Sequence, residues 1–171
     1  AQQGADVTVV EKNEQAGGRA RVFRKDGFLF DMGPSWYWMP DIFERFFNQF
    51  GKSAKDYYTL KRLDPSYRVF WEVEVADIPA NFTELQAFFD AKEQGAGQKL
   101  EAFMKEAAYK YDVGINKFVH KPGLSIFEFM NWDVLSSLFK IDMFTSMHSH
   151  VRSFFKHPKL LQLAEFPILF L

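Results

Sequence analysis

The sequence predicts a mixed fold, in which an α/β first part (residues 1–80) is followed by a largely helical, truncated second part (residues 81–171). Three observations support this prediction. An apolar run at residues 7–10 is typical of a buried parallel strand. Short β-rich segments continue to about residue 80. From about Asn81 onward, apolar residues recur at helical spacing instead.

Composition and charge limit the classes of protein to which this chain can belong. The 171 residues can build one core, or one domain with part of another. Hydrophobic residues make up 47% and charged residues 25%, which fits a globular protein. A net charge of −1 gives no reason to expect nucleic acid as a partner, and the lack of cysteine excludes disulfides and thiolate sites. The 21 phenylalanines indicate a strongly hydrophobic interior, a lipid-facing surface or a large apolar ligand.

Both ends of the sequence resemble those of a fragment. The chain opens at Ala1 without a methionine, and Gly4 has the character of a helix C-cap, so we expect a helix to end where the sequence begins. At the other end the chain stops inside the apolar run 166–171, which a complete soluble protein would leave exposed. We therefore expect a piece of a longer protein.

The elements of the first part follow in chain order. Short strands are expected at residues 20–24 and 28–31. Apolar residues at helical spacing predict a helix over 40–51, which Gly51 closes. Residues 67–71 and 73–78 then predict a pair of strands in a hairpin or meander.

The second part carries helix signals almost throughout. Thr83 with Gln86, and Ser125 with Glu128, have the spacing of capping boxes. One face of a long helix, from Leu100 to Val119, is apolar. Residues 143–156 predict another helix, with an apolar face opposite basic side chains. That pattern fits a helix lying on an anionic membrane and equally a helix packed on a core.

Glu11 directly follows the apolar run at residues 7–10. A dinucleotide-binding unit places an acidic residue there, about 20 residues after a glycine loop, to accept hydrogen bonds from ribose hydroxyls. Counting back that far passes Ala1, so the glycine loop is expected outside this sequence. A glutamate at the end of a strand is also a common solvated loop residue, and this position alone leaves both interpretations open.

A second motif, Gly17-Gly18-Arg19, follows six residues after Glu11. Glycines let the backbone approach a pyrophosphate closely, and an arginine supplies a forked donor for phosphate oxygens. A Gly-Gly pair is also common in ordinary turns. Together with the preceding strand, the arrangement is similar to the second FAD-contact motif of the flavoprotein superfamily that contains amine oxidases, protoporphyrinogen oxidases and carotenoid desaturases.

Longer segments resemble bacterial-type phytoene desaturases. The run from Asp26 to Ser35, DGFLFDMGPS, resembles the dGFxFDxGPs segment of that family. Further similar blocks lie at residues 57–58, 63–71, 154–160 and 166–167, so that the resemblance spans essentially the whole chain. In this family a short Asp-Gly turn usually occupies the region that is 71–77 here, so the position of the turn is open.

The resemblance implies a partial Rossmann-type FAD-binding domain, without its first strand and glycine loop, and an inserted helical domain that contacts substrate and membrane. It implies FAD as cofactor and Glu11, Gly17, Gly18, Arg19, Gly33, Pro34 and Ser35 as cofactor-binding residues. No catalytic acid or base can be named. The whole protein is then expected to desaturate a carotenoid precursor such as phytoene. It is expected in the cytoplasm, bound peripherally to the membrane, whereas the fragment itself should be inactive.

Two alternatives remain open. One is a related flavin amine oxidase, and the other is a non-catalytic fragment that folds only partly and adheres to membranes. His148, His150 and His157 suggest a metal site only superficially, because a helical spacing of two puts the first pair on nearly opposite sides. We therefore expect no metal. Residues 36–39 are apolar lining for a polyene or simply core.

Overall fold

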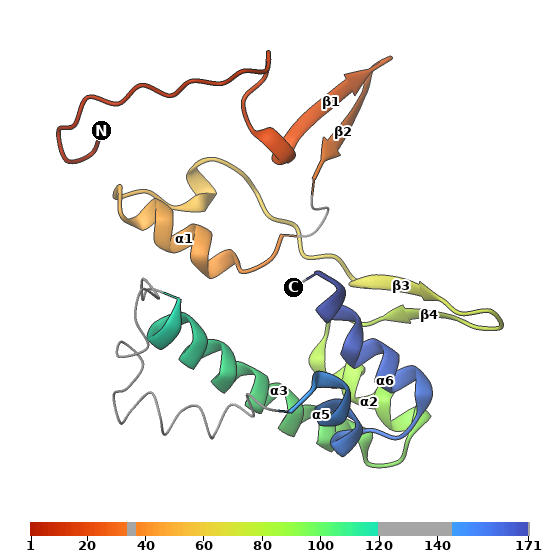
Figure 1. Ribbon diagram of the computed structural model, residues 1–171. Coiled ribbons are helices and arrows are strands. Elements are labelled where there is room, and N and C mark those ends of the chain that lie inside the picture. The colour runs from red at the N-terminus through yellow and green to blue at the C-terminus, as the bar shows by residue number, and fades with distance from the viewer. Residues whose placement is uncertain (34–36, 120–144, 171) are drawn as a thin grey trace. The chain divides into compact units, whose positions relative to one another are not determined.

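This computed structural model describes residues 1–33, 37–119 and 145–170, which form two compact units (Figure 1). The first unit spans Ala1–Lys61 and the second Arg62–Leu171. Small sheets and several helices give the chain a mixed α/β character, as expected. The predicted division into a cofactor-binding part and a substrate-binding part at residue 80 is not tested by these compact units, because compactness does not tell which part binds which molecule. It stays a prediction.

A β-hairpin is the first regular element of the first unit. After a 3₁₀ turn (Gly18–Ala20), strands β1 (Arg21–Lys25) and β2 (Phe28–Met32) pair antiparallel (Figure 1). The two residues between them, Asp26 and Gly27, have φ values of 51° and 82°. Positive φ at both positions is what a two-residue turn needs to match the twist of the strands, and Asp-Gly is a preferred sequence for it.

Helix α1 (Pro40–Asn48) follows, with a 3₁₀ turn at Ala54–Asp56. Pro40 occupies the first helical position, where its missing N–H costs nothing. The chain leaves the helix through Gly51, which has a φ of 67°, while Lys52 N donates to Phe47 O at 3.1 Å. This left-handed exit agrees with the predicted end of the helix.

The predicted strand at residues 7–10 does not form. Its residues are exposed and belong to no ladder, and neither sheet of the described chain includes them. A parallel strand exists only through hydrogen bonds to a neighbour, and the described residues supply no such neighbour. Gly4 does adopt a left-handed φ of 84°, but it closes an isolated turn with Ala1 O rather than a helix.

The second unit contains a second hairpin and a helical layer. Strands β3 (Tyr67–Phe70) and β4 (Val75–Ile78) pair antiparallel around a turn in which Trp71 N donates to Glu74 O at 2.8 Å. The helices are α2 (Phe82–Lys92), α3 (Ala96–Val113), a π-helical turn (Gly114–Phe118), α5 (Met147–Phe154), α6 (Pro158–Glu165) and a 3₁₀ turn (Phe166–Phe170).

The helix starts differ from the predicted capping boxes. Asn81 caps α2, since its side-chain oxygen accepts from Thr83 N at 2.9 Å and from Glu84 N at 3.3 Å. Thr83 therefore lies inside the helix, because asparagine is the stronger N-cap and stands two residues earlier. The predicted pair Ser125 and Glu128 lies outside the described residues.

The only extended core among the described residues lies in the second unit. It joins the inner face of β4 with α2, α3, α6 and the segment around α5, through Ala76, Ile78, Phe89, Ala96, Leu100, Val151, Phe155, Leu160 and Leu163. Phe155 packs edge-on against Phe89, with ring centroids 5.3 Å apart. Of the two interpretations left open for residues 143–156, the structure favours a helix packed on a core.

Two carboxylates, those of Glu74 and Glu93, link the elements that surround this core. Glu74 pairs with Lys92 at 2.6 Å and with Lys159, and both ammonium groups lie over the ring of Trp71. Glu93 accepts the backbone N–H groups of Lys156 and His157. These contacts tie the hairpin and the α2–α3 turn to the α5–α6 connection.

Within residues 1–33, 37–119 and 145–170, no helix has both the length and the apolar character of a transmembrane span.

Candidate functional site

Five of the seven predicted cofactor residues lie in the described part of the first unit, while Pro34 and Ser35 lie outside it. Glu11 is exposed and lies outside any helix or strand. Its Oε1 accepts two hydrogen bonds from Asn13, one from the backbone N at 2.9 Å and one from Nδ2 at 2.8 Å. These bonds fix one oxygen of the carboxylate and leave Oε2 for another donor.

Both glycines of the pair adopt backbone conformations that favour glycine. Gly17 and Gly18 have φ values of 114° and 54°, in the region that favours glycine. Ala20 N donates to Gly17 O at 2.8 Å, which closes the 3₁₀ turn around Arg19. A side chain at either glycine would strain this turn.

Gly33 lies against the same turn. A Cβ atom placed on Gly33 would stand 2.5 Å from the carbonyl oxygen of Arg19, closer than real Cβ contacts come. The end of β2 therefore passes directly beside the Arg19 backbone, and only glycine permits this approach. The structure thus brings together Gly33 and Arg19, which are separate motifs in the sequence.

Glu11 stands apart from this pair. In the described residues no hydrogen bond joins it to Gly17, Gly18 or Arg19. The guanidinium of Arg19 likewise has no ion-pair partner within the described ranges. A carboxylate for ribose hydroxyls, a glycine turn without Cβ atoms and an open guanidinium for phosphate form a donor and acceptor set that fits an adenine dinucleotide.

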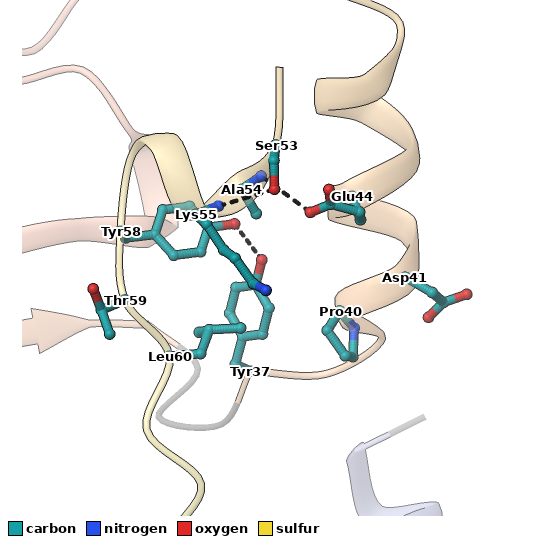
Figure 2. Close-up of a pocket in the computed structure, with 10 residues that line it drawn as sticks. All are labelled: Tyr37, Pro40, Asp41, Glu44, Ser53, Ala54, Lys55, Tyr58, Thr59 and Leu60. Carbon is teal, nitrogen blue, oxygen red and sulfur yellow. Dashed lines mark hydrogen bonds between the residues drawn. The ribbon is translucent and has the colours of Figure 1, made fainter. Parts of the chain in front are cut away.

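A pocket of about 690 Å³ lies elsewhere in the first unit, between α1 and the 3₁₀ turn at Ala54–Asp56 (Figure 2). The ten residues lining it are Tyr37, Pro40, Asp41, Glu44, Ser53, Ala54, Lys55, Tyr58, Thr59 and Leu60. None of them belongs to the predicted cofactor set. A smaller, apolar hollow along α1 shares Tyr37 and Tyr58 with it.

Hydrogen bonds organise the wall of this pocket. The hydroxyls of Tyr37 and Tyr58 point toward each other and form a hydrogen bond (Figure 2). Glu44 Oε2 accepts from Ala54 N at 3.0 Å, which ties the helix to the turn. Partial burial, the hydrogen bond to Tyr58 and the negative charge of Glu44 raise the pKa of Tyr37 to about 12. Like an ordinary tyrosine, Tyr37 is a neutral hydroxyl at physiological pH, and its raised pKa makes ionisation still less favourable.

Two of the histidines considered for a metal site, His148 and His150, contact acidic side chains. His148 Nδ1 lies 2.8 Å from Glu165, and His150 Nε2 lies 3.6 Å from Glu106. Within the described ranges no three histidine, aspartate or glutamate side chains gather as metal ligands would.

Two contributors escaped prediction from the sequence. Asn13 orients Glu11, and its position two residues after an acidic side chain, in a loop, is a usable signal because asparagine bonds readily to nearby groups. Tyr58 pairs with Tyr37 from 21 residues away, and no local pattern indicates such a pair.

Comparison with known proteins places the chain in a family. The model of the flavin containing amine oxidoreductase family matches residues 1–161. Carotenoid 3,4-desaturase of Haloarcula japonica is 43% identical over 170 residues, which cover 98% of this chain and 34% of the relative. The 4,4'-diapophytoene desaturase (4,4'-diaponeurosporene-forming) of Staphylococcus haemolyticus is 29% identical over 172 residues, covering 100% of this chain and 34% of the relative.

The chain thus spans about a third of the length of these curated relatives. Family membership implies FAD as the cofactor, in agreement with the Glu11 and Gly17–Arg19 motifs. The chain belongs to the flavin containing amine oxidoreductase family.

Proposed function

We propose that the full-length protein is an FAD-dependent desaturase of a carotenoid or carotenoid precursor such as phytoene. The 43% identity to a carotenoid 3,4-desaturase over 98% of this chain carries the proposal. The family also includes amine oxidoreductases by its description. One of the two relatives compared above is named as a carotenoid desaturase and the other as a diapophytoene desaturase, which favours a carotenoid or its precursor over an amine as substrate.

The proposed cofactor site combines Glu11, the Gly17–Arg19 turn and Gly33 in a Rossmann-type domain. The first strand and glycine loop of this domain would precede Ala1 in the full-length protein. Glu11 Oε2 would bind the ribose hydroxyls, and Arg19 would bind the phosphates or flavin oxygens, with Pro34 and Ser35 continuing past Gly33. Bound FAD would supply the two-electron oxidation, and the protein would bind it and exclude water.

A carotenoid substrate offers almost no polar group for recognition. Its binding would rest on apolar burial, at roughly 25 cal/mol per Å². A substrate of this kind dissolves in lipid, so we propose that the protein is cytoplasmic and contacts the membrane peripherally. Val151 and Phe155 are buried in the core, so a membrane contact of α5 and the residues after it would rest instead on exposed Met147, Arg152 and Lys156. Binding to anionic vesicles that weakens with salt would support this contact.

Cofactor binding tests the site. In the full-length protein, Glu11→Ala and Arg19→Ala should each weaken FAD binding by roughly 10-fold or more, because each removes a charge-assisted hydrogen bond of about 1.5 to 3 kcal/mol. Lys12→Ala is the matched control, since it removes a charge beside Glu11 without touching the motif. FAD affinity measured by flavin fluorescence decides the question. Wild-type affinity in both variants would refute the assignment.

A further inference from the structure

We propose that one face of the β1–β2 hairpin is a docking surface for polypeptide of the full-length protein that lies outside these 171 residues. The pairing register defines this face. Phe23 stands opposite Phe30, and Phe28 and Met32 lie two residues to either side of Phe30 on the same strand. Because side chains alternate between the faces of a strand, these four apolar side chains share one face.

The face carries a cluster of three phenylalanine rings beside Met32, and by the same register Arg21 and Lys25 flank it, opposite Met32 and Phe28. The rings of Phe23 and Phe30 lie 6.2 Å apart, and those of Phe28 and Phe30 lie 6.3 Å apart. All four side chains are nevertheless exposed, with Phe30 at 52% and Phe28 at 68%. An isolated two-stranded hairpin is marginal in water, and a clustered apolar face of this kind marks an interaction site.

The hairpin edges indicate what covers the face. β1 and β2 form a two-stranded sheet in the described chain, so each has an outer edge with unpaired backbone N–H and C=O groups. Lipid acyl chains can cover phenylalanine but offer no hydrogen bonds to such groups, whereas polypeptide can cover the face and pair with the edges. The curated relatives are about three times as long as this chain, so their extra length is ample for this role.

The hairpin lies next to the turn that carries Arg19. β2 leads directly into Gly33, whose backbone lies against Arg19. Polypeptide packed on Phe30 would therefore also hold the turn that carries Arg19. The inference itself rests on register, exposure and the length of the relatives, and it does not require that Arg19 bind FAD.

A pair of serine substitutions in the full-length protein tests the proposal. Phe30 and Leu29 are neighbours on β2, equally exposed in this structure at 52% and 55%, but they point to opposite faces. Phe30→Ser should lower the apparent melting temperature by about 4 °C or more, because a buried ring would be lost. Leu29→Ser should lower it by about 1 °C or less, as an exposed side chain does. Equal effects of the two changes would overturn the proposal.

Hydroxyl-radical footprinting identifies the cover and remains informative if Phe30→Ser fails to fold. In the wild-type full-length protein, Phe28 and Phe30 should be oxidised as slowly as the core residue Phe155, without lipid and at every protein concentration. Protection only in the presence of phosphatidylglycerol vesicles would show that the membrane, and not polypeptide, covers the face. Protection that grows with protein concentration would show that a second copy of the protein covers the face. FAD affinity measured in parallel separates this result from the cofactor assignment, since either can fail alone.

Discussion

At the residue scale, glycine and its neighbours explain the local geometry of the candidate site. Gly33 and Arg19 approach through their backbones, and the steric room that a Cβ atom would need is already filled by the Arg19 carbonyl oxygen at 2.5 Å. The hydrogen bonds from Asn13 to Glu11 position the carboxylate in a similar way, through a neighbour rather than through burial. The backbone approach and the hydrogen bonds both lie in exposed parts of the chain, where no hydrophobic core holds the side chains in place.

The Gly33 contact yields a prediction. Gly33→Ala in the full-length protein should weaken FAD binding by roughly 5-fold or more, because the added methyl group must push β2 away from the Arg19 turn by several tenths of an ångström. Flavin fluorescence titration measures the effect. Gly114→Ala is a suitable control, since a Cβ atom there meets open space. If Gly33→Ala binds FAD like the wild type, the backbone approach has no role in the site.

Sequence reasoning finds site residues when the signal is local. Glu11 and Gly17–Arg19 are predicted from a short, local spacing, and in the structure both glycines have positive φ values, which favour glycine. The same reasoning misses the pair formed by Tyr37 and Tyr58, because the loop between them brings the rings together only after folding. Cofactor contact by the predicted residues remains a prediction.

At the element scale, two hairpins and most helices agree with the sequence, because alternation, turn chemistry and helical spacing act within a few residues. β1–β2 and β3–β4 follow their predicted ranges closely. The strand predicted at residues 7–10 fails for the opposite reason, since a parallel strand depends on a distant partner. For α5 the pattern permits two environments, and only the packing of Val151 and Phe155 separates them.

Glu93 is the clearest link between elements. It is mostly buried at the end of α2, with Lys99 Nζ 2.6 Å away and the N–H groups of Lys156 and His157 at 2.7 and 2.9 Å. Burial opposes its ionisation, but the hydrogen bonds from Lys99 and from these two amides outweigh burial and lower its pKa to about 2. The charged carboxylate therefore fastens the α5–α6 connection to the α2–α3 turn.

This lowered pKa predicts acid sensitivity. A carboxyl group whose pKa is lower in the folded state stabilises the fold fully above its unfolded value of 4.5, and the contribution is lost as pH falls toward about 2. Glu93→Gln in the full-length protein should lose about 1 to 3 kcal/mol at pH 7 and show a smaller further loss in acid. Melting temperatures at pH 7 and pH 3 measure both effects.

A surface carboxylate provides the control for this experiment. The hydrogen bond from Lys105 also lowers the pKa of Glu101, but this pair lies on the exposed surface of α3. Glu101→Gln should hardly change the melting temperature, since exposed pairs contribute little. Equal losses for Glu93→Gln and Glu101→Gln would contradict the role of Glu93 as a link between elements.

At the scale of the whole molecule, the two units differ in how they are held together. The second unit has a core drawn from one strand and four helical segments, whereas Ala54 is the only buried residue in the described part of the first unit. A unit that buries so little apolar surface cannot offset the conformational entropy of folding. The first unit carries the candidate cofactor site, so its stability is expected to come from polypeptide and cofactor outside these 171 residues.

The activity of the full-length protein tests the central claim most directly. Purified protein should convert phytoene or a related carotenoid, supplied in liposomes, into products with more conjugated double bonds, with FAD as the only added cofactor. Absorption spectra and chromatography of the extracted pigments follow the reaction. The account predicts a shift of the absorption maximum to longer wavelength that is absent without FAD. Oxidation of a soluble amine, with every carotenoid left unchanged, would contradict it.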